Sequence, residues 1–268
     1  LRTAVRCGTP EITMMLASIA VGGLHLVGRW DEALEVCGIG LAAAREAGDR
    51  DGECTLLEDQ GQLHQFTGRW QAAAESLHAA LALARDLGSS AVEAEVLGRL
   101  GWGCLELSEY RGAKEYLEAS LNLLTVESPA RFRAFLEGCL ARAHTGLGDH
   151  ELALRHGENG VELLVRAGIE GAQPYTFYGL ACARQAVADH AEVIRLCERA
   201  LEVAFEHGNP RDRALLLDTL GGSLLHTGDR ERAVACWTEA VLIFDTHGEH
   251  RARDLRERLA ALVSASAG

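Results

Sequence analysis

The chain has 268 residues, of which 48% are hydrophobic, and its formal net charge is −13. A nucleic-acid-binding module usually carries a basic surface, so this acidic balance argues against direct binding of DNA or RNA. No apolar run reaches the length of a membrane-spanning helix, so a membrane partner is not expected either.

A six-residue pattern recurs every 40 residues along the chain. It begins as Gly28-Arg29-Trp30-Asp31-Glu32-Ala33 and returns from Gly68, Ser108, Gly148, Ala188 and Gly228. A fixed period in this range is typical of a solenoid, in which one supersecondary unit is repeated. Because each unit contacts mainly its neighbours, we expect one continuous, all-α solenoid.

The first eight residues match residues 41–48, which form the end of a predicted helix. The same residue types recur 40 positions later, as Leu1 and Leu41, Ala4 and Ala44, and Gly8 and Gly48. We therefore expect residues 1–8 to be the end of a preceding repeat in a fragment of a longer protein. They should form one or two helical turns packed on the first repeat.

Each full repeat is predicted to be a pair of helices. In the first repeat, one helix runs from about Glu11 to Val27, and the next from about Asp31 to Ala47, ending at Gly48. Glycine just past a helix end supplies a left-handed cap, and it recurs at Gly88, Gly168, Gly208 and Gly248. The predicted repeats span residues 11–48, 51–88, 91–128, 129–168, 172–208 and 210–248. Residues 251–268 are predicted to be a capping helix and tail, because a terminal unit needs a polar outer face.

The cysteines and histidines show no pattern that predicts a metal site or a catalytic site. The eight cysteines include no CxxC pair, and the histidines lack the spacing of zinc hydrolases. Cys37 and Cys197 share a repeat position with Leu77 and Leu117, which predicts small buried hydrophobic residues. Reduced cysteines are typical of the cytosol. We expect a cytoplasmic protein that is not an enzyme and that has no cofactor and no metal.

The repeat resembles the tetratricopeptide repeat, whose pattern is W-x2-L-G-x2-Y on the first helix and A-x3-F on the second. The matches are Leu97-x2-Leu100-Gly101-x2-Cys104, Leu217-x2-Leu220-Gly221-x2-Leu224, Ala113-x3-Leu117 and Ala233-x3-Trp237. The resemblance implies a right-handed superhelical solenoid of six helix pairs plus a C-terminal capping helix. The repeat is longer than the family's and lacks its terminal proline. Such long repeats resemble the sensor domains of bacterial STAND-type, SARP and large LuxR-like transcription activators.

The resemblance also implies where a partner would bind, since first helices line the concave face in this family. The groove positions here are mixed aromatic and polar, which suits a binding surface. They are Glu58, Gln62, Gln65, Glu95, Trp102, Glu106, Phe135, Arg142, Tyr175, Tyr178, Gln185, Asp218 and His226. For any one of them the alternative is a half-buried position without a ligand. Trp30 and Trp70 occupy the turn position and are predicted to pack between helices.

Two hypotheses for function remain open. The first is a non-catalytic sensor domain of a larger bacterial regulatory protein, with a protein, peptide or small-molecule effector on its concave face. Trp102, Arg142 and Tyr178 would line one cleft and project away from the inter-helix core, and the acidic groove residues favour a ligand with a cationic group. The second is a constitutive protein–protein scaffold or oligomerisation module, which would form a homo-oligomer.

Overall fold

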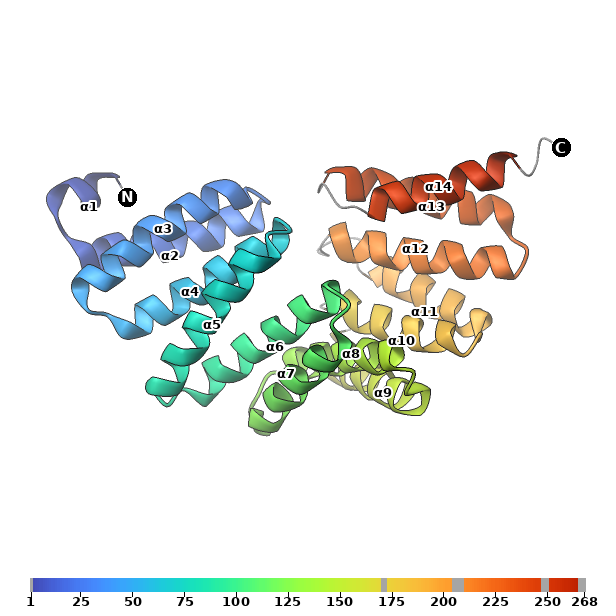
Figure 1. Ribbon diagram of the computed structural model, residues 1–268, viewed down its shortest axis with the longest axis horizontal. Coiled ribbons are helices and arrows are strands. Elements are labelled where there is room, and N and C mark those ends of the chain that lie inside the picture. Colours follow the sequence, from blue (N-terminus) through green and yellow to red (C-terminus); the bar gives the residue numbers. More distant parts are fainter. Residues whose placement is uncertain (1, 170–172, 204–209, 247–250, 265–268) are drawn as a thin grey trace. The chain divides into compact units, whose positions relative to one another are not determined.

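The computed structural model describes residues 2–169, 173–203, 210–246 and 251–264 (Figure 1). Every regular element in these ranges is an α-helix, so the predicted all-α fold class is confirmed. Leu1, the predicted caps Gly208 and Gly248, and the end of the predicted tail lie outside the described residues.

The helices fall into two compact units, and each unit is described by itself. The N-terminal unit comprises residues 1–107 and 118–124, and the C-terminal unit comprises residues 108–117 and 125–268. The first contains α1 (Arg2–Cys7), α2 (Pro10–Leu26), α3 (Trp30–Ala47), α4 (Arg50–Phe66), α5 (Trp70–Asp86) and α6 (Ser90–Glu106). The helix α7 (Tyr110–Leu123) contributes residues to both units. The second contains α8 (Ala130–Leu147), α9 (His150–Ala167), α10 (Pro174–Ala186), α11 (His190–Val203), α12 (Pro210–His226), α13 (Arg230–Thr246) and α14 (Arg251–Ser264).

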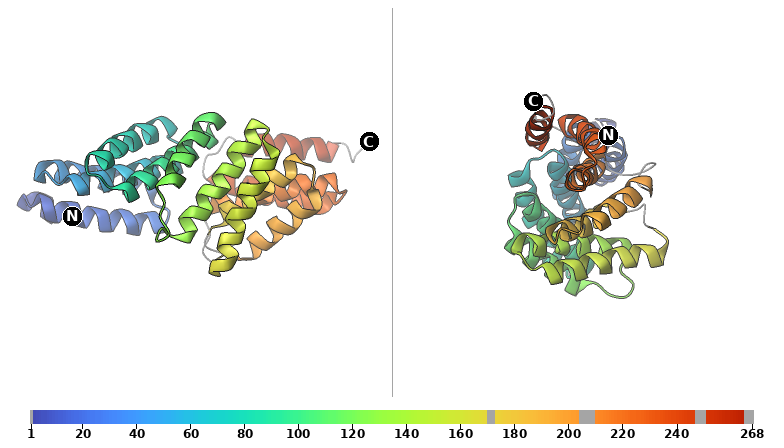
Figure 2. Two further views of the ribbon diagram at one scale, coloured as in Figure 1. Left: turned by 90° about the horizontal axis from the view of Figure 1, so that it is seen from below. Right: turned by 90° about the vertical axis from the view of Figure 1, so that its right-hand side faces the viewer.

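Within each unit, consecutive helices pack against one another as antiparallel neighbours. Contacts run from α2 to α6 in the N-terminal unit and from α8 to α14 in the C-terminal unit. Figure 2 shows this succession from two further directions. Each helix therefore packs mainly on its neighbours in sequence, which is the contact pattern of a repeat protein.

Glycine caps set the turns between these helices. Gly48 has φ of +70°, and the left-handed conformation recurs at the same repeat position in Gly88 and Gly168. A second left-handed position opens the turn inside each helix pair. Glycine holds it in four repeats, whereas Ser108 has φ of 60° and Ala188 has φ of 58° there. A side chain in this conformation strains the backbone, since Cβ crowds the carbonyl oxygen.

Glycines occur where helices approach closely. A Cβ on Gly61 of α4 would lie 2.5 Å from Cγ of Leu77 on α5. A Cβ on Gly221 of α12 would lie 2.6 Å from Cδ1 of Trp237 on α13. Each glycine leaves the space that a large side chain of the partner helix fills.

The residue that opens a second helix packs on the following repeat. Trp30 stacks on Phe66 with ring centroids 5.6 Å apart, and Trp70 meets Trp102 edge-on at 6.0 Å. In the C-terminal unit His190 stacks on His226 at 4.4 Å. The prediction that Trp30 and Trp70 are packing residues is confirmed. These contacts tie each helix pair to the next one.

Candidate functional site

The first helices of the C-terminal unit, α8, α10 and α12, contact one another and bring several predicted site residues together. Two glycines cause the closest approach. A Cβ on Gly179 of α10 would lie 2.2 Å from the carbonyl oxygen of Gly138 on α8, and a Cβ on Gly138 would lie 2.7 Å from Cα of Thr176. The backbones of α8 and α10 are therefore in contact. Their larger side chains meet on either side of this crossing.

Arg142 of α8 lies against the rings of two tyrosines of α10. Its Cζ is 5.4 Å from the ring centroid of Tyr175 and 5.0 Å from that of Tyr178, and Nη1 donates a hydrogen bond to the Tyr175 hydroxyl. The two tyrosine rings meet edge-on at 5.6 Å, and Phe135 adds a third ring 5.6 Å from Tyr175. The electron-rich faces of the rings attract a cation, and this interaction contributes about 2 kcal/mol when the cation is held out of water.

Cys182 of α10 is affected by charged residues of α8, α12 and α14. Burial is the main cause that raises the pKa of the Cys182 thiol, and the charges of Arg142 and Arg251 and a hydrogen bond with Tyr178 oppose it. The carboxylate of Asp218 acts on the same thiol. Charged residues of α8, α12 and α14 therefore act on the Cys182 thiol of α10.

A cavity of about 220 Å³ lies between α12 and α14. It is lined by Asp218, Arg251, Asp254, Leu255 and Arg258. Asp218 Oδ1 lies 3.5 Å from Nη1 of Arg258, and burial raises the pKa of the Asp218 carboxyl while the two arginines lower it. We refer to the cluster of the half-buried Phe135 and the buried Arg142, Tyr175 and Tyr178, hereafter the tyrosine cluster, together with Cys182 and this cavity as the Arg–Tyr face. It consists of Phe135, Arg142, Tyr175, Tyr178, Cys182, Asp218, Arg251, Asp254 and Arg258.

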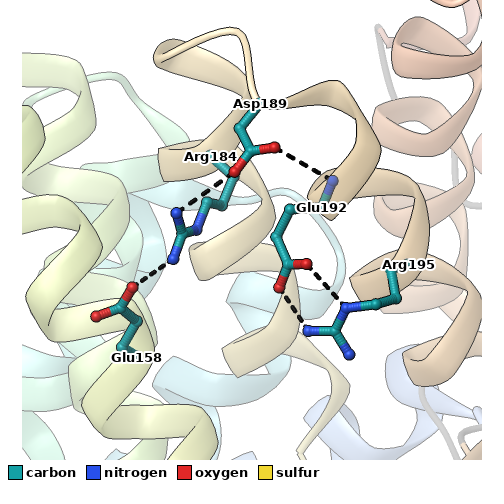
Figure 3. A network of polar contacts seen from close by, with 5 residues as sticks. All are labelled: Glu158, Arg184, Asp189, Glu192 and Arg195. Carbon is teal, nitrogen blue, oxygen red and sulfur yellow. Dashed lines mark hydrogen bonds and ion pairs between the residues drawn. The ribbon is translucent and has the colours of Figure 1, made fainter.

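An ion-pair network holds the C-terminal end of α10 in place (Figure 3). Arg184 pairs with Glu158 of α9 and, at 3.4 Å, with Asp189. Asp189 accepts a hydrogen bond from the backbone N–H of Glu192, whose carboxylate accepts one from Arg195 Nε at 2.8 Å. Glu158 anchors α10 to α9, so the network fixes the helix that carries both tyrosines of the Arg–Tyr face.

Three predicted site residues in the N-terminal unit are engaged in packing within that unit. Glu58 accepts a 2.8 Å hydrogen bond from Arg99 Nε, and Gln65 donates one of 2.8 Å to the Arg99 carbonyl. Trp102 is 8% exposed and lies against Phe66 and Trp70. The expectation that Trp102 projects away from the inter-helix core is therefore wrong, because two aromatic side chains of α4 and α5 cover its ring.

The same correction applies to Arg142 and Tyr178, which are 8% and 7% exposed. These two residues lie together in the C-terminal unit, whereas Trp102 belongs to the N-terminal unit. The structure therefore brings together Phe135, Arg142, Tyr175 and Tyr178, and it places Asp218 in the cavity beside Arg258. Gln185 is half-buried on α10 and His226 is exposed at the end of α12. In the N-terminal unit Glu95 is exposed, and Gln62 and Glu106 are half-buried.

Sequence reasoning missed Cys182 and the α14 residues Arg251, Asp254 and Arg258. The 40-residue period could have pointed to two of these residues, because each lies one repeat after a predicted site residue. Cys182 follows Arg142 by 40 residues, and Arg258 follows Asp218 by 40. Residues 251–268 were assigned only a capping role, although α14 occupies the position of a further first helix. The period therefore places the basic residues of α14 beside Asp218.

One segment of the chain matches a known repeat family. Residues 56–91 match the tetratricopeptide repeat family. No curated protein matches the sequence. In the described ranges, no helix is long and apolar enough to cross a membrane, and no group of three or more His, Cys, Asp or Glu side chains is placed to hold a metal ion.

Solved structures similar to this chain share its helical fold. The Rap protein complexed with Competence and Sporulation Factor superposes with a TM-score of 0.71 at 13% identity, covering 89% of this chain and 66% of that one. NprR in complex with its cognate peptide NprX gives 0.69 at 13% identity, covering 95% and 72%. BtubC (BKLC) from P. vanneervenii gives 0.55 at 18% identity, covering 90% and 92%. At such identities the similarity shows the fold alone, which is a TPR-like helical solenoid.

Proposed function

We propose that this chain is a non-catalytic binding module whose Arg–Tyr face receives a peptide, as the sensor domain of a larger bacterial regulatory protein. The observation that carries the proposal is the placement of Arg142. Its guanidinium lies against two tyrosine rings, and the same unit holds a charged cavity between α12 and α14. Arg and Tyr are the side chains that most often dominate binding energy where a contact is desolvated.

The size of the cavity favours a peptide over a bulky effector. Its volume is about 220 Å³, whereas sites for drug-sized ligands usually enclose roughly 300–1,000 Å³. One side chain or one chain terminus fills such a cavity. Peptide ligands accompany the similar Rap and NprR structures, which is consistent with this choice.

The charge of the Arg–Tyr face favours an anionic group on the peptide. Arg251 and Arg258 line the cavity with two carboxylates, those of Asp218 and Asp254, and Arg142 adds a further positive charge that acts on Cys182. The expectation of a cationic group rested on four acidic residues. Three of them, Glu58, Glu95 and Glu106, belong to the N-terminal unit, and Glu58 is already paired with Arg99. The fourth, Asp218, lines the cavity beside Arg258. We therefore infer that a terminal carboxylate or an acidic side chain enters the cavity.

The test is a thermal-shift screen of the purified chain against pools of short peptides with free or amidated C-termini. A ligand present at 100 times its Kd stabilises the folded state by about 2.7 kcal/mol, which raises the melting temperature measurably. We expect responses from peptides with an anionic terminus or an acidic residue. Calorimetric titration then measures the affinity of each responding peptide.

Variants assign that binding to the Arg–Tyr face. Arg258→Gln changes an exposed side chain that lines the cavity, so the fold is retained, and we expect at least a tenfold loss of affinity, or about 1.4 kcal/mol. Arg142→Lys keeps the charge but loses the planar guanidinium. Arg131→Gln, on the exposed side of α8, is the matched control and should bind as the wild type does. Equal binding by all three variants would refute the proposed site.

The alternative is a constitutive scaffold or oligomerisation module. The burial of Tyr175, which is 2% exposed, favours it, because a buried tyrosine cluster also serves as packing between repeats. A scaffold would respond to no peptide pool. It would instead bind a folded protein or itself, and the change in molecular mass on light scattering would show this.

A further inference from the structure

Two histidine rings stack between α8 and α9. The ring centroids of His144 and His156 lie 5.2 Å apart, with 6° between the ring planes. Their side chains are 2% and 17% exposed. At the same two repeat positions, the sixth repeat has Leu224 and the fifth has Leu196, and both are 2% exposed. Histidine is the side chain whose charge changes near neutral pH. In the fourth repeat, therefore, two ionisable rings stand where an apolar side chain can pack.

Each of the two rings faces a different kind of carboxylate. His156 Nδ1 lies 2.7 Å from Oε2 of Glu137 on α8, whose side chain is only 11% exposed. His144 Nδ1 lies 3.3 Å from Oδ2 of Asp149, in the turn between the helices, and that side chain is 53% exposed. An ionised carboxylate only accepts hydrogen bonds, so each Nδ1 carries the proton. His156 can become charged beside a carboxylate held out of water, whereas water screens the charge of Asp149. The first added proton therefore belongs on His156.

The surroundings of His144 oppose a second proton. Burial is the main cause that lowers the pKa of His144, and the charges of His156 and of Lys114 on α7 lower it further, while Asp149 opposes them. The helix α10 also packs on α8 and α9, and its charged residue Arg184 is engaged in the ion pairs of Figure 3. Because folding lowers the pKa of His144, the stability it contributes is present above pH 6.5 and is lost as the pH falls below that value.

We propose that the two stacked histidines form an acid-sensitive joint between α8 and α9, which holds one added proton and opens when a second one enters. The joint lies next to the tyrosine cluster in the chain. The helix α8 carries Arg142, and Glu158 of α9 holds α10 through Arg184, so opening the joint loosens the support of that cluster. The inference does not depend on the proposed peptide site, because its test measures amide exchange and not binding.

The test is amide hydrogen exchange of the whole chain at pH 7.5 and pH 5.5, read by mass spectrometry and corrected for the intrinsic effect of pH. In the wild type we expect the protection of α8 and α9 to fall by up to about tenfold. That is the limit for one histidine that has a pKa of about 6.5 in the unfolded chain and stays neutral in the folded protein. His144→Leu with His156→Leu should abolish the fall. The fold should be retained, because leucine packs at both positions in other repeats.

Two further variants make the assignment specific. His190→Trp with His226→Phe is the matched control, because it replaces the other stacked pair of this unit with the residue types that stack as Trp30 and Phe66 at the same repeat positions. It should leave the response of α8 and α9 unchanged.

Lys114→Gln keeps both histidines of the joint and removes a charge that opposes the second proton, so it should lessen the fall in protection. Equal protection of the wild type at both pH values would overturn the proposal. A fall of the same size in His144→Leu with His156→Leu, or one that only the His190 and His226 variant abolishes, would also overturn it.

Discussion

Asp59 provides a test of how the N-terminal unit is packed, because its contribution to stability depends on pH. Burial, and then the charge of Glu58, raises the pKa of the Asp59 carboxyl from 3.8 to about 6, against the opposing charge of Arg99. A pKa raised by folding means that the folded state binds the proton more tightly than the unfolded state does. The contribution of Asp59 to stability is therefore fully present below pH 4 and is lost as the pH rises through 6.

The magnitude follows from the difference in pKa between the two states. Each pKa unit corresponds to about 1.36 kcal/mol, so a difference of roughly two gives on the order of 3 kcal/mol between pH 4 and pH 7. Asp59→Asn keeps the shape of the side chain and cannot ionise. We expect the variant to exceed the wild type in free energy of unfolding by on the order of 3 kcal/mol at pH 7, and by almost nothing at pH 4.

The assay is urea unfolding of the wild type and Asp59→Asn at intervals between pH 4 and pH 8, followed by circular dichroism. Glu35→Gln, on the exposed side of α3, is the control for a general loss of negative charge. A difference between Asp59→Asn and the wild type that stays constant across this range would refute the reasoning. The Asp59 carboxylate would then be well solvated in the folded protein.

Two further substitutions test the packing described above. Trp102→Ala should destabilise the N-terminal unit by about 3–5 kcal/mol, because the ring is buried against Phe66 and Trp70; a melting temperature equal to that of the wild type would place the ring in solvent instead. Ala188→Gly should stabilise the C-terminal unit by about 1 kcal/mol, because the residue has φ of 58° at a position that glycine holds in four other repeats. Ala235→Gly, on the exposed side of α13 and inside that helix, is its control and should destabilise, since glycine weakens a helix interior.

The period of 40 residues was enough to determine the helices and their order. It placed the second helix of the first repeat within one residue of α3, and it identified Gly48, Gly88 and Gly168 as left-handed caps. It also identified Trp30 and Trp70 as packing residues. These features are local, or they join one repeat to the next. A fixed period specifies such contacts because every repeat meets its neighbour through the same positions.

The burial of an individual side chain depended on the residues opposite it, which the period does not specify. Trp102 and Arg142 occupy the same repeat position, yet Trp102 packs on Phe66 and Trp70, whereas Arg142 lies against two tyrosines of α10. Both were expected to project into one cleft. The aromatic partners differ because α4 and α5 supply them in one case and α10 in the other. Only the tertiary structure decides how much of each side chain those partners remove from water.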